Sequence, residues 1–302
     1  MSDSTQNQWS KPGIIDFETS ADGLEIFRIH TGSITARFAI QGAHLIDFTN
    51  NENIPLLFIS RQSLFAPGKA IRGGIPVIFP WFGPREGHPE SPMHGLVRTR
   101  PWQISEITIH PDGTAKVGFS FNDSPETLAL WPHTFELKLE FTLGRELEVR
   151  WEVRNSGQNA FRFEQALHPY FPVQDVLRAN VQGLAGATYI DKTDSLKLKE
   201  EGADAIVFSG ETDRLYLDTT STCILEDQAA GRRLTISKTG ADSSVVWNPW
   251  ITKAAALSDM ADDEWKEFVC VEQANANRNA IELKSGETHV FSARYATTSV
   301  GI

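Results

Sequence analysis

Strict alternation of apolar and polar residues in the middle of the chain constrains the fold more than any other feature. The apolar residues occupy every second position in two runs, namely Phe135, Leu137, Leu139, Phe141 and Leu143, then Leu147, Val149, Trp151 and Val153. A period of two places successive side chains on opposite faces of a β-strand. Because only the stretch Gly144-Arg145-Glu146 separates the runs, they predict an antiparallel hairpin. Its outer face carries charges of opposite sign that can pair across the strands.

Similar runs predict strands along most of the chain, at 25–30, 34–40, 44–49, 103–109, 115–121, 222–227, 233–238, 267–272 and 289–295. Many strands, few helical signals and turns rich in Gly, Pro and Asn predict an all-β fold, a twisted antiparallel β-sandwich with a few short helices. The chain shows no internal repeat and no linker, so we expect one domain over residues 1–302, with 1–20 as an N-terminal extension.

Two segments carry helix signals. In 124–133, Ser124 can cap the N-terminus and Pro125 can occupy the first helical position. The segment 258–268 can form a second short helix, capped at Ser258 or Asp259.

The composition narrows the classes of partner. The 302 residues include 28 Lys plus Arg and 39 Asp plus Glu, a formal net charge of −11, which disfavours binding to nucleic acid or to an anionic membrane. We find no signal-peptide pattern and no apolar stretch long enough to span a membrane. Cys223 and Cys270 lack metal-type spacing and are expected to be buried thiols in a reducing compartment. We therefore expect a cytoplasmic protein, and a monomer, since no long exposed apolar helix calls for a partner.

The segment 61–100 differs from the rest of the chain in charge and in backbone chemistry. It holds six basic residues against two acidic ones, and Gly73-Gly74 and several prolines interrupt any regular strand. A long loop that concentrates arginine in an acidic protein is suited to bind an anion. The alternative is that these arginines pair with surface carboxylates, which is common and contributes little.

Polar residues stand at the ends of two apolar runs. His168 follows Phe163–Leu167 in an aromatic setting and precedes Pro169, which favours an extended backbone before it. Glu272 closes the run Phe268–Val271, where a carboxylate is costly to bury unless it is hydrogen-bonded or used. Two such residues could face one cavity as an acid/base pair. Each could also be a structural residue, and spacing alone does not fix the distance between them.

Several motifs resemble those of the hexose-6-phosphate mutarotases, also called glucose-6-phosphate 1-epimerases, which are relatives of galactose mutarotase in the aldose 1-epimerase superfamily. These motifs are IRGGIPVIFPWFGP, HGLVR, ALHPYF, DRLY, WNPWITKAAALSD and VCVEQAN, and they span roughly residues 25–295 in the order of that family. The resemblance implies a twisted β-sandwich of the galactose mutarotase-like (supersandwich) type. It also implies that no metal, nucleotide or redox cofactor is needed.

The resemblance also implies roles for particular residues. His168 matches the catalytic histidine of the family and Glu272 its catalytic glutamate. The substrate-binding positions are matched by Arg72, His94, Arg98 and Asp213. Of these, the two arginines would hold a 6-phosphate, the aspartate a sugar hydroxyl, and His94 is a second active-site histidine in the galactose branch. Met93 departs from relatives that place Gln there, because Met cannot donate a hydrogen bond to a sugar hydroxyl.

The implied activity is interconversion of the α and β anomers of hexose 6-phosphates, chiefly glucose 6-phosphate. Glu272 as a carboxylate would take the proton of the anomeric hydroxyl, while protonated His168 would give one to the ring oxygen. Trp247 and the aromatic residues of FPWFG could line a sugar face or simply fill the core.

Three other functions stay open at this point. They are an aldose 1-epimerase acting on unphosphorylated sugars, a non-catalytic carbohydrate-binding or sensor module, and a metal-dependent enzyme of the cupin type. The last fits poorly, since the eight histidines are scattered with no H-x-H pattern.

Overall fold

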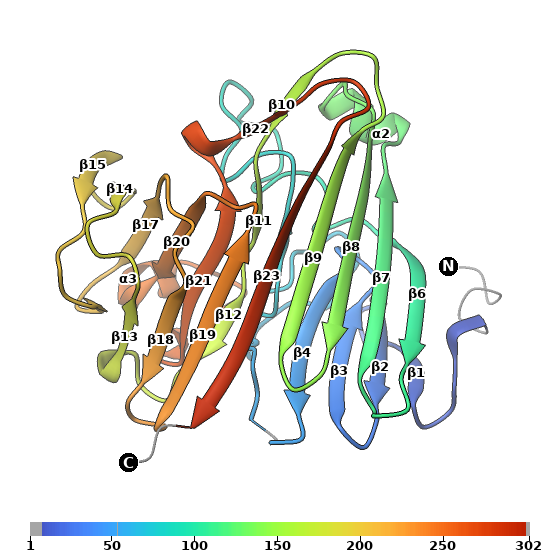
Figure 1. Ribbon diagram of the computed structural model, residues 1–302, viewed down its shortest axis with the longest axis horizontal. Helices are drawn as coiled ribbons and strands as arrows, with labels where there is room; N and C mark the ends of the chain where they lie inside the picture. The colour runs from blue at the N-terminus through green and yellow to red at the C-terminus, as the bar shows by residue number, and fades with distance from the viewer. Residues whose placement is uncertain (1–7, 53, 300–302) are drawn as a thin grey trace.

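The structure is a computed structural model that describes residues 8–52 and 54–299. Its strands pair antiparallel in a nine-stranded, an eight-stranded and a four-stranded sheet, with a further two-stranded ribbon of β10 (Phe161–Phe163) and β22 (Ile281–Leu283). Figure 1 shows the nine-stranded sheet across the front of the molecule, with the other large sheets behind it. The predicted all-β sandwich is confirmed.

The predicted hairpin lies inside the nine-stranded sheet. The strands of this sheet are, in order, β16 (Ile206–Val207), β13 (Ala179–Gln182), β18 (Cys223–Asp227), β19 (Arg232–Thr239), β23 (Thr288–Ser299), β9 (Leu147–Asn155), β8 (Phe135–Leu143), β7 (Ala115–Asn122) and β6 (Gln103–Ile109). Phe135 faces Asn155 and Leu143 faces Leu147, so β8 and β9 pair over their whole length. The apolar side chains of both strands are buried, as the period of two predicts.

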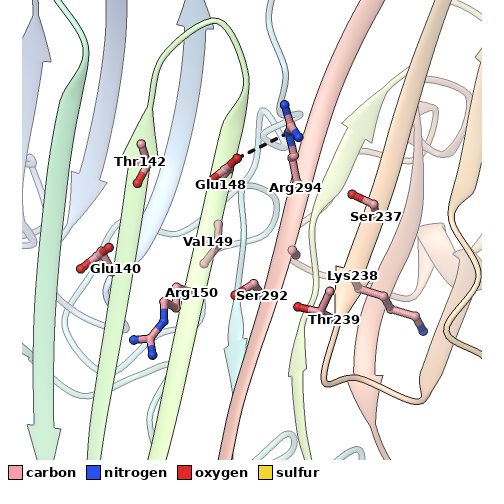
Figure 2. Close-up of a pocket in the computed structure, with 11 residues that line it drawn as sticks. Glu140, Thr142, Glu148, Val149, Arg150, Ser237, Lys238, Thr239, Ser292 and Arg294 are labelled. Carbon is pink, nitrogen blue, oxygen red and sulfur yellow. Dashed lines mark ion pairs between the residues drawn. The ribbon is translucent and has the colours of Figure 1, made fainter.

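The outer face of this sheet carries charges that pair across neighbouring strands. Arg154 on β9 lies 3.1 Å from Glu136 on β8, and Arg294 on β23 lies 3.5 Å from Glu148 on β9. Figure 2 shows the latter pair beside an open hollow of about 300 Å³ over β8, β9, β23 and β19. Such exposed pairs each contribute about 0.2–1 kcal/mol. None of the residues predicted for the site lines this hollow.

The eight-stranded sheet is buried on both sides at its centre. It consists of β15 (Lys197–Glu200), β14 (Thr188–Asp191), β17 (Thr212–Tyr216), β20 (Ser243–Asn248), β21 (Phe268–Asn275), β11 (Gln165–Leu167) and β5 (Val77–Ile78), with β12 (Tyr170–Pro172) also beside β21. Every residue of β20 and β21 is buried. A strand covered on both faces loses the alternation that reveals a strand in sequence, and β20 was accordingly not predicted.

The four-stranded sheet contains β1 (Ile15–Thr19), β2 (Glu25–His30), β3 (Ile34–Ala39) and β4 (His44–Asn50). Phe38 on β3 packs against Phe119 on β7 and Phe141 on β8, at ring-centroid distances of 5.7 and 5.1 Å. This sheet therefore covers one half of the nine-stranded sheet, and burial of each such ring contributes about 1.5–3 kcal/mol. β1 lies inside the stretch 1–20 that the sequence suggested as an extension, and it pairs with β2.

The eight-stranded sheet covers the other half. On β23, Tyr295 donates a hydrogen bond to Gln273 of β21, and its ring lies 5.6 Å from that of Phe171 on β12. Cys223 and Cys270 are buried and unbonded to each other, as expected.

The first predicted helix is confirmed and the second is wrong. Helix α2 (Pro125–Leu130) begins after Ser124, whose hydroxyl accepts a bond from the Thr127 amide. In 258–268 only a three-residue 3₁₀ turn, η2 (Glu264–Lys266), is present, and helix α3 (Trp250–Ala255) lies earlier in the chain. The reason is tertiary: Asp259 bonds to Arg72, and Glu264 bonds to Ser60 and Arg61 as well as to the Ala261 amide of its own segment.

The segment 61–100 contains little regular structure apart from β5, as predicted. Gly74 has a φ of +63°, and a Cβ at this position would lie 2.4 Å from the carbonyl oxygen of Leu45. Glycine therefore allows the chain to pass this close to β4 two residues after Arg72. Within the described residues, no helix is long and apolar enough to cross a membrane.

Candidate active site

The six residues that the sequence singled out lie around one cavity of about 370 Å³. The cavity lies between the 61–100 segment and the eight-stranded sheet, and the residues are Arg72, His94, Arg98, His168, Asp213 and Glu272. They come from sequence positions 200 residues apart, so only the folded chain brings them together.

His168 and Glu272 are in direct contact. Nε2 of His168 lies 3.2 Å from Oε1 of Glu272. The contact follows from strand pairing, because β11 and β12 flank His168 and both pair with β21, which carries Glu272. The backbone amide of His168 donates to the carbonyl of Pro76, which fixes the chain between the two short strands.

The other polar atom of each side chain is buried without a partner. Neither Nδ1 of His168 nor Oε2 of Glu272 has a hydrogen bond in the described part of the protein. An unsatisfied buried polar atom costs about 1–3 kcal/mol, so few are kept without a role. Two of them on one contacting pair make this pair a candidate for acid/base chemistry.

Burial favours the uncharged form of both members of this pair. It raises the pKa of Glu272 well above its ordinary value, against the effect of Lys192 and together with that of Asp213. Burial also lowers the pKa of His168 to about 3, and the positive charges of Arg72, Arg98 and Lys192 act in the same direction. Burial thus favours the form in which the pair shares one proton, as a carboxylic acid and a neutral imidazole. The ionised pair expected from the sequence is not the form that burial favours.

His94 is held in one tautomer by the backbone. Its Nδ1 accepts a hydrogen bond of 3.2 Å from the amide of Gly83, and its own amide donates to the Gly83 carbonyl. Because an amide can only donate, we assign the ring proton to Nε2. Burial keeps the pKa of His94 well below its usual value, so the ring is a neutral hydrogen-bond donor. Its positive φ of 64° is a strained conformation of the kind that clusters at functional sites.

The arginines of the 61–100 segment fall into two groups. Arg61 pairs with the surface carboxylates of Asp263 and Glu267, as the alternative interpretation of this segment expected. Arg72 and Arg98 instead line the cavity.

Arg72 is oriented by two partners. Its Nε and Nη2 donate to the two oxygens of Asp259, each at 3.1 Å, and Nη1 donates to the Tyr170 hydroxyl at 3.1 Å. The guanidinium of Arg98, by contrast, makes no hydrogen bond or ion pair with any residue of 8–52 or 54–299. Burial lowers the pKa of Arg98, and Asp259 acts on it only from a distance. A half-buried guanidinium without a hydrogen-bonded carboxylate is suited to bind an anion.

Two lysines of the site were missed in the sequence. Nζ of Lys192 lies 3.3 Å from Asp213 and 4.4 Å from the centre of the Phe82 ring, and Nζ of Lys253 lies 3.7 Å from the other oxygen of Asp213. Both lysines line the cavity. Neither stands in an unusual sequence context, so no local signal could have identified them.

Aromatic rings form part of the wall. The Tyr170 ring stacks on His168 at a centroid distance of 4.9 Å and an interplanar angle of 12°. The Trp247 ring stands nearly perpendicular to that of His168, with the centroids 5.8 Å apart. Trp247 also packs on Phe268 at 5.7 Å, so it serves both the core and the cavity. Met93 is 50% exposed at the cavity wall. Across 8–52 and 54–299, no cluster of three His, Cys, Asp or Glu side chains is placed to hold a metal ion.

The chain belongs to the aldose 1-epimerase family, whose sequence profile matches residues 25–296. A protein of Cenchrus ciliaris whose name describes it as a candidate glucose-6-phosphate 1-epimerase is 36% identical over 83% of this chain and 78% of its own length. A protein of Escherichia coli with the same name is 34% identical over 89% of both chains.

Solved structures agree with this assignment. A crystal structure of a candidate mutarotase, YeaD of Salmonella typhimurium, is 28% identical and superposes with a TM-score of 0.88 over 96% of this chain and 95% of its own. A galactose mutarotase-like protein of Clostridium acetobutylicum superposes with a TM-score of 0.70 over 95% of this chain and 98% of its own at 15% identity. The latter likeness supports the galactose mutarotase-like fold alone.

Proposed function

We propose that this enzyme interconverts the α and β anomers of hexose 6-phosphates, chiefly glucose 6-phosphate, with His168 and Glu272 as its acid/base pair. The family supports an epimerase acting at the anomeric carbon. The single observation that supports the phosphate is Arg98, whose guanidinium lines the cavity that also holds the pair and makes no ion pair with any described residue.

The contact between His168 and Glu272 suits ring opening. The base removes the proton from the anomeric O1, the C1–O5 bond breaks, and the acid gives a proton to the ring oxygen O5. Because O1 and O5 are bonded to the same carbon, the acid and the base must lie side by side, as atoms 3.2 Å apart do. Rotation about C1–C2 presents the other face of the aldehyde, and closure with the two roles reversed gives the other anomer.

The remaining residues have roles in binding. Arg72 and Arg98 bind the 6-phosphate. Hydrogen bonds to Asp259 and Tyr170 hold the Arg72 guanidinium in a fixed orientation before the substrate binds. The neutral His94 ring donates from Nε2 to a sugar oxygen, and Asp213 accepts from a sugar hydroxyl between its two lysines. This arrangement needs no cofactor.

We also propose that the chain works as a single-domain monomer in the cytoplasm. All residues of the site come from one chain, so a second copy is not required to complete it. Two buried free thiols and a phosphorylated substrate suit a reducing compartment.

The test follows anomer exchange of glucose 6-phosphate and free glucose side by side by NMR exchange spectroscopy. We expect glucose 6-phosphate to exchange faster at equal enzyme concentration, and Arg98→Met to remove most of this preference by raising KM for the phosphate ester. Loss of a charge-assisted contact costs about 1.5–3 kcal/mol, which is roughly a 10- to 150-fold rise. Equal exchange rates for both sugars would contradict the proposal and favour an aldose 1-epimerase that acts on unphosphorylated sugars. Exchange of neither sugar would favour a non-catalytic binding module.

A further inference from the structure

The charges around the His168–Glu272 pair are distributed unevenly. Arg72, Arg98 and Lys192 disfavour a proton on His168. Glu272 instead responds to Lys192 and Asp213, which act on it in opposite directions. The two arginines proposed to hold the phosphate therefore act more strongly on His168 than on Glu272.

The geometry explains why. The Arg72 guanidinium is bonded to the Tyr170 hydroxyl at 3.1 Å, and the Tyr170 ring lies face to face with His168. One side chain thus separates the phosphate-binding group from the imidazole. Lys192 pairs instead with Asp213 of β17. This strand belongs to the same sheet as β21, which carries Glu272, and only β20 lies between them.

The cations on the His168 side are only partly compensated. Asp259 pairs with Arg72 and Asp213 with Lys192, whereas Arg98 makes no ion pair of its own among the described residues and is reached by the charge of Asp259 only at longer range. A tetrahedral dianion bound by the two arginines would offset this excess of positive charge near His168. His94 and Tyr170, the other titratable groups facing the imidazole, stay neutral, since burial lowers the pKa of His94 and raises that of Tyr170.

Building on the proposed function, we propose that a dianion bound by Arg72 and Arg98 moves the shared proton from Glu272 to His168 and thereby activates the site. The proton crosses the 3.2 Å contact from Oε1 to Nε2, and no other bond changes. The pair then consists of a carboxylate base and an imidazolium acid. The sugar ring and the phosphate need not belong to one molecule, so a free dianion activates anomer exchange of unphosphorylated glucose.

The magnitude follows from the proton equilibrium. Each unit by which the anion raises the pKa of His168 relative to that of Glu272 multiplies the ratio of the ionised pair to the neutral pair about tenfold. We therefore expect saturating dianion to raise kcat/KM for glucose roughly tenfold or more. If the substrate phosphate served only to anchor the substrate, it would change KM alone. Free dianion would then have no effect on the rate of glucose anomer exchange.

The experiment measures glucose anomer exchange by NMR with the full-length enzyme and increasing sodium sulfate or phosphite, at ionic strength held constant with sodium chloride. Sulfate is included because it is too weak a base to catalyse the reaction itself, and samples without enzyme correct for the effect of phosphite. We expect a saturable rise in the wild type that is absent in Arg98→Met. Arg154→Met removes an arginine from the outer face of β9 and should keep the full response.

Glucose 6-phosphate is measured in the same samples, so the two hypotheses can fail separately. Both dianions should compete with it at the concentrations that activate glucose. If glucose 6-phosphate exchanges rapidly and the dianions compete with it without activating glucose, the activation is overturned and the proposed function stands. If neither dianion competes, the two arginines do not form a dianion site, and the activation is again overturned. If glucose 6-phosphate exchanges no faster than glucose, the proposed function itself fails.

Discussion

Asp259 holds Arg72 by two hydrogen bonds of 3.1 Å, one to each of its oxygens. Both side chains are largely shielded, with 22% and 16% of the side chain exposed. The carboxylate therefore fixes the Nε and Nη2 edge of the guanidinium. This orientation directs Nη1 at the Tyr170 hydroxyl.

We expect Asp259→Ala to lower the free energy of unfolding by about 1.5–3 kcal/mol, because it removes hydrogen bonds to a charged group. Inorganic phosphate should restore part of this loss, since the dianion replaces the carboxylate as the partner of Arg72. Thermal melts with and without phosphate measure both effects. Asp47→Ala is the matched control, because Asp47 pairs with Arg37 outside the cavity and its loss should not respond to phosphate. An equal phosphate effect in the two variants would contradict the account of Arg72.

Stability should fall at acid pH in part because of His44. Burial lowers the pKa of His44 from 6.5 to about 3, while Nε2 makes a bond of 2.9 Å to the Gly73 carbonyl. The unfolded state then binds more protons than the folded state between these values, so this contribution is complete above pH 6.5 and is lost as the pH falls towards 3.

Denaturant unfolding at several pH values tests this directly. The free energy of unfolding should decline by at most about 1.4 kcal/mol per pH unit for this one histidine. His44→Gln keeps a donor near Gly73 but cannot titrate, and its curve should be flatter by that slope. Parallel curves for the wild type and the variant would show that His44 does not carry the effect.

His94 should remain neutral in the folded protein with its proton on Nε2. This follows from the Gly83 amide that donates to Nδ1 and from the burial that keeps its pKa low. Long-range ¹H–¹⁵N NMR from pH 8 to pH 5 should show one unchanged tautomer for this ring. Titration of His94 within that range would remove it as a fixed donor and would make it a competing candidate for the acid.

His94→Asn should fold, because Asn tolerates a positive φ well. Loss of the ring donor should reduce exchange of glucose 6-phosphate by roughly 10²–10³-fold, the range seen when one donor to a developing charge is removed. His30→Asn, at an exposed position on β2, is the control for the substitution itself. Full activity in His94→Asn would place this ring outside the reaction.

The strands that alternate were predictable and the buried ones were not. β8 and β9 show their period in every residue, whereas β20 is buried throughout and contains Ser243, Ser244 and Asn248 without any period. Their polar groups are satisfied by tertiary partners; Asn248, for example, donates to the carbonyls of Trp265 and Phe268. These hydrogen-bond partners come together only in the folded chain, so no local sequence pattern predicts them.

The site was predictable only in part for the same reason. His168 and Glu272 stood out as polar residues in apolar runs, and family resemblance supplied the remaining four positions. Asp259 was interpreted as a helix cap, because its actual partner, Arg72, is 187 residues away in the sequence. The charges of His168 and Glu272 also depend on burial and on neighbouring arginines, which the sequence does not place.

The central claim is that His168 and Glu272 act together as acid and base. It is tested most directly by NMR exchange of glucose 6-phosphate anomers in His168→Asn, Glu272→Gln and the double variant. His289→Asn, which changes a histidine of β23 that does not line the cavity, is the matched control.

We predict near-normal melting temperatures and a fall in exchange of about 10²–10⁴-fold in each single variant, with the double variant little slower than either. The control should keep full exchange. A folded His168→Asn or Glu272→Gln that retains most of its activity would contradict the claim, and so would losses that simply multiply in the double variant.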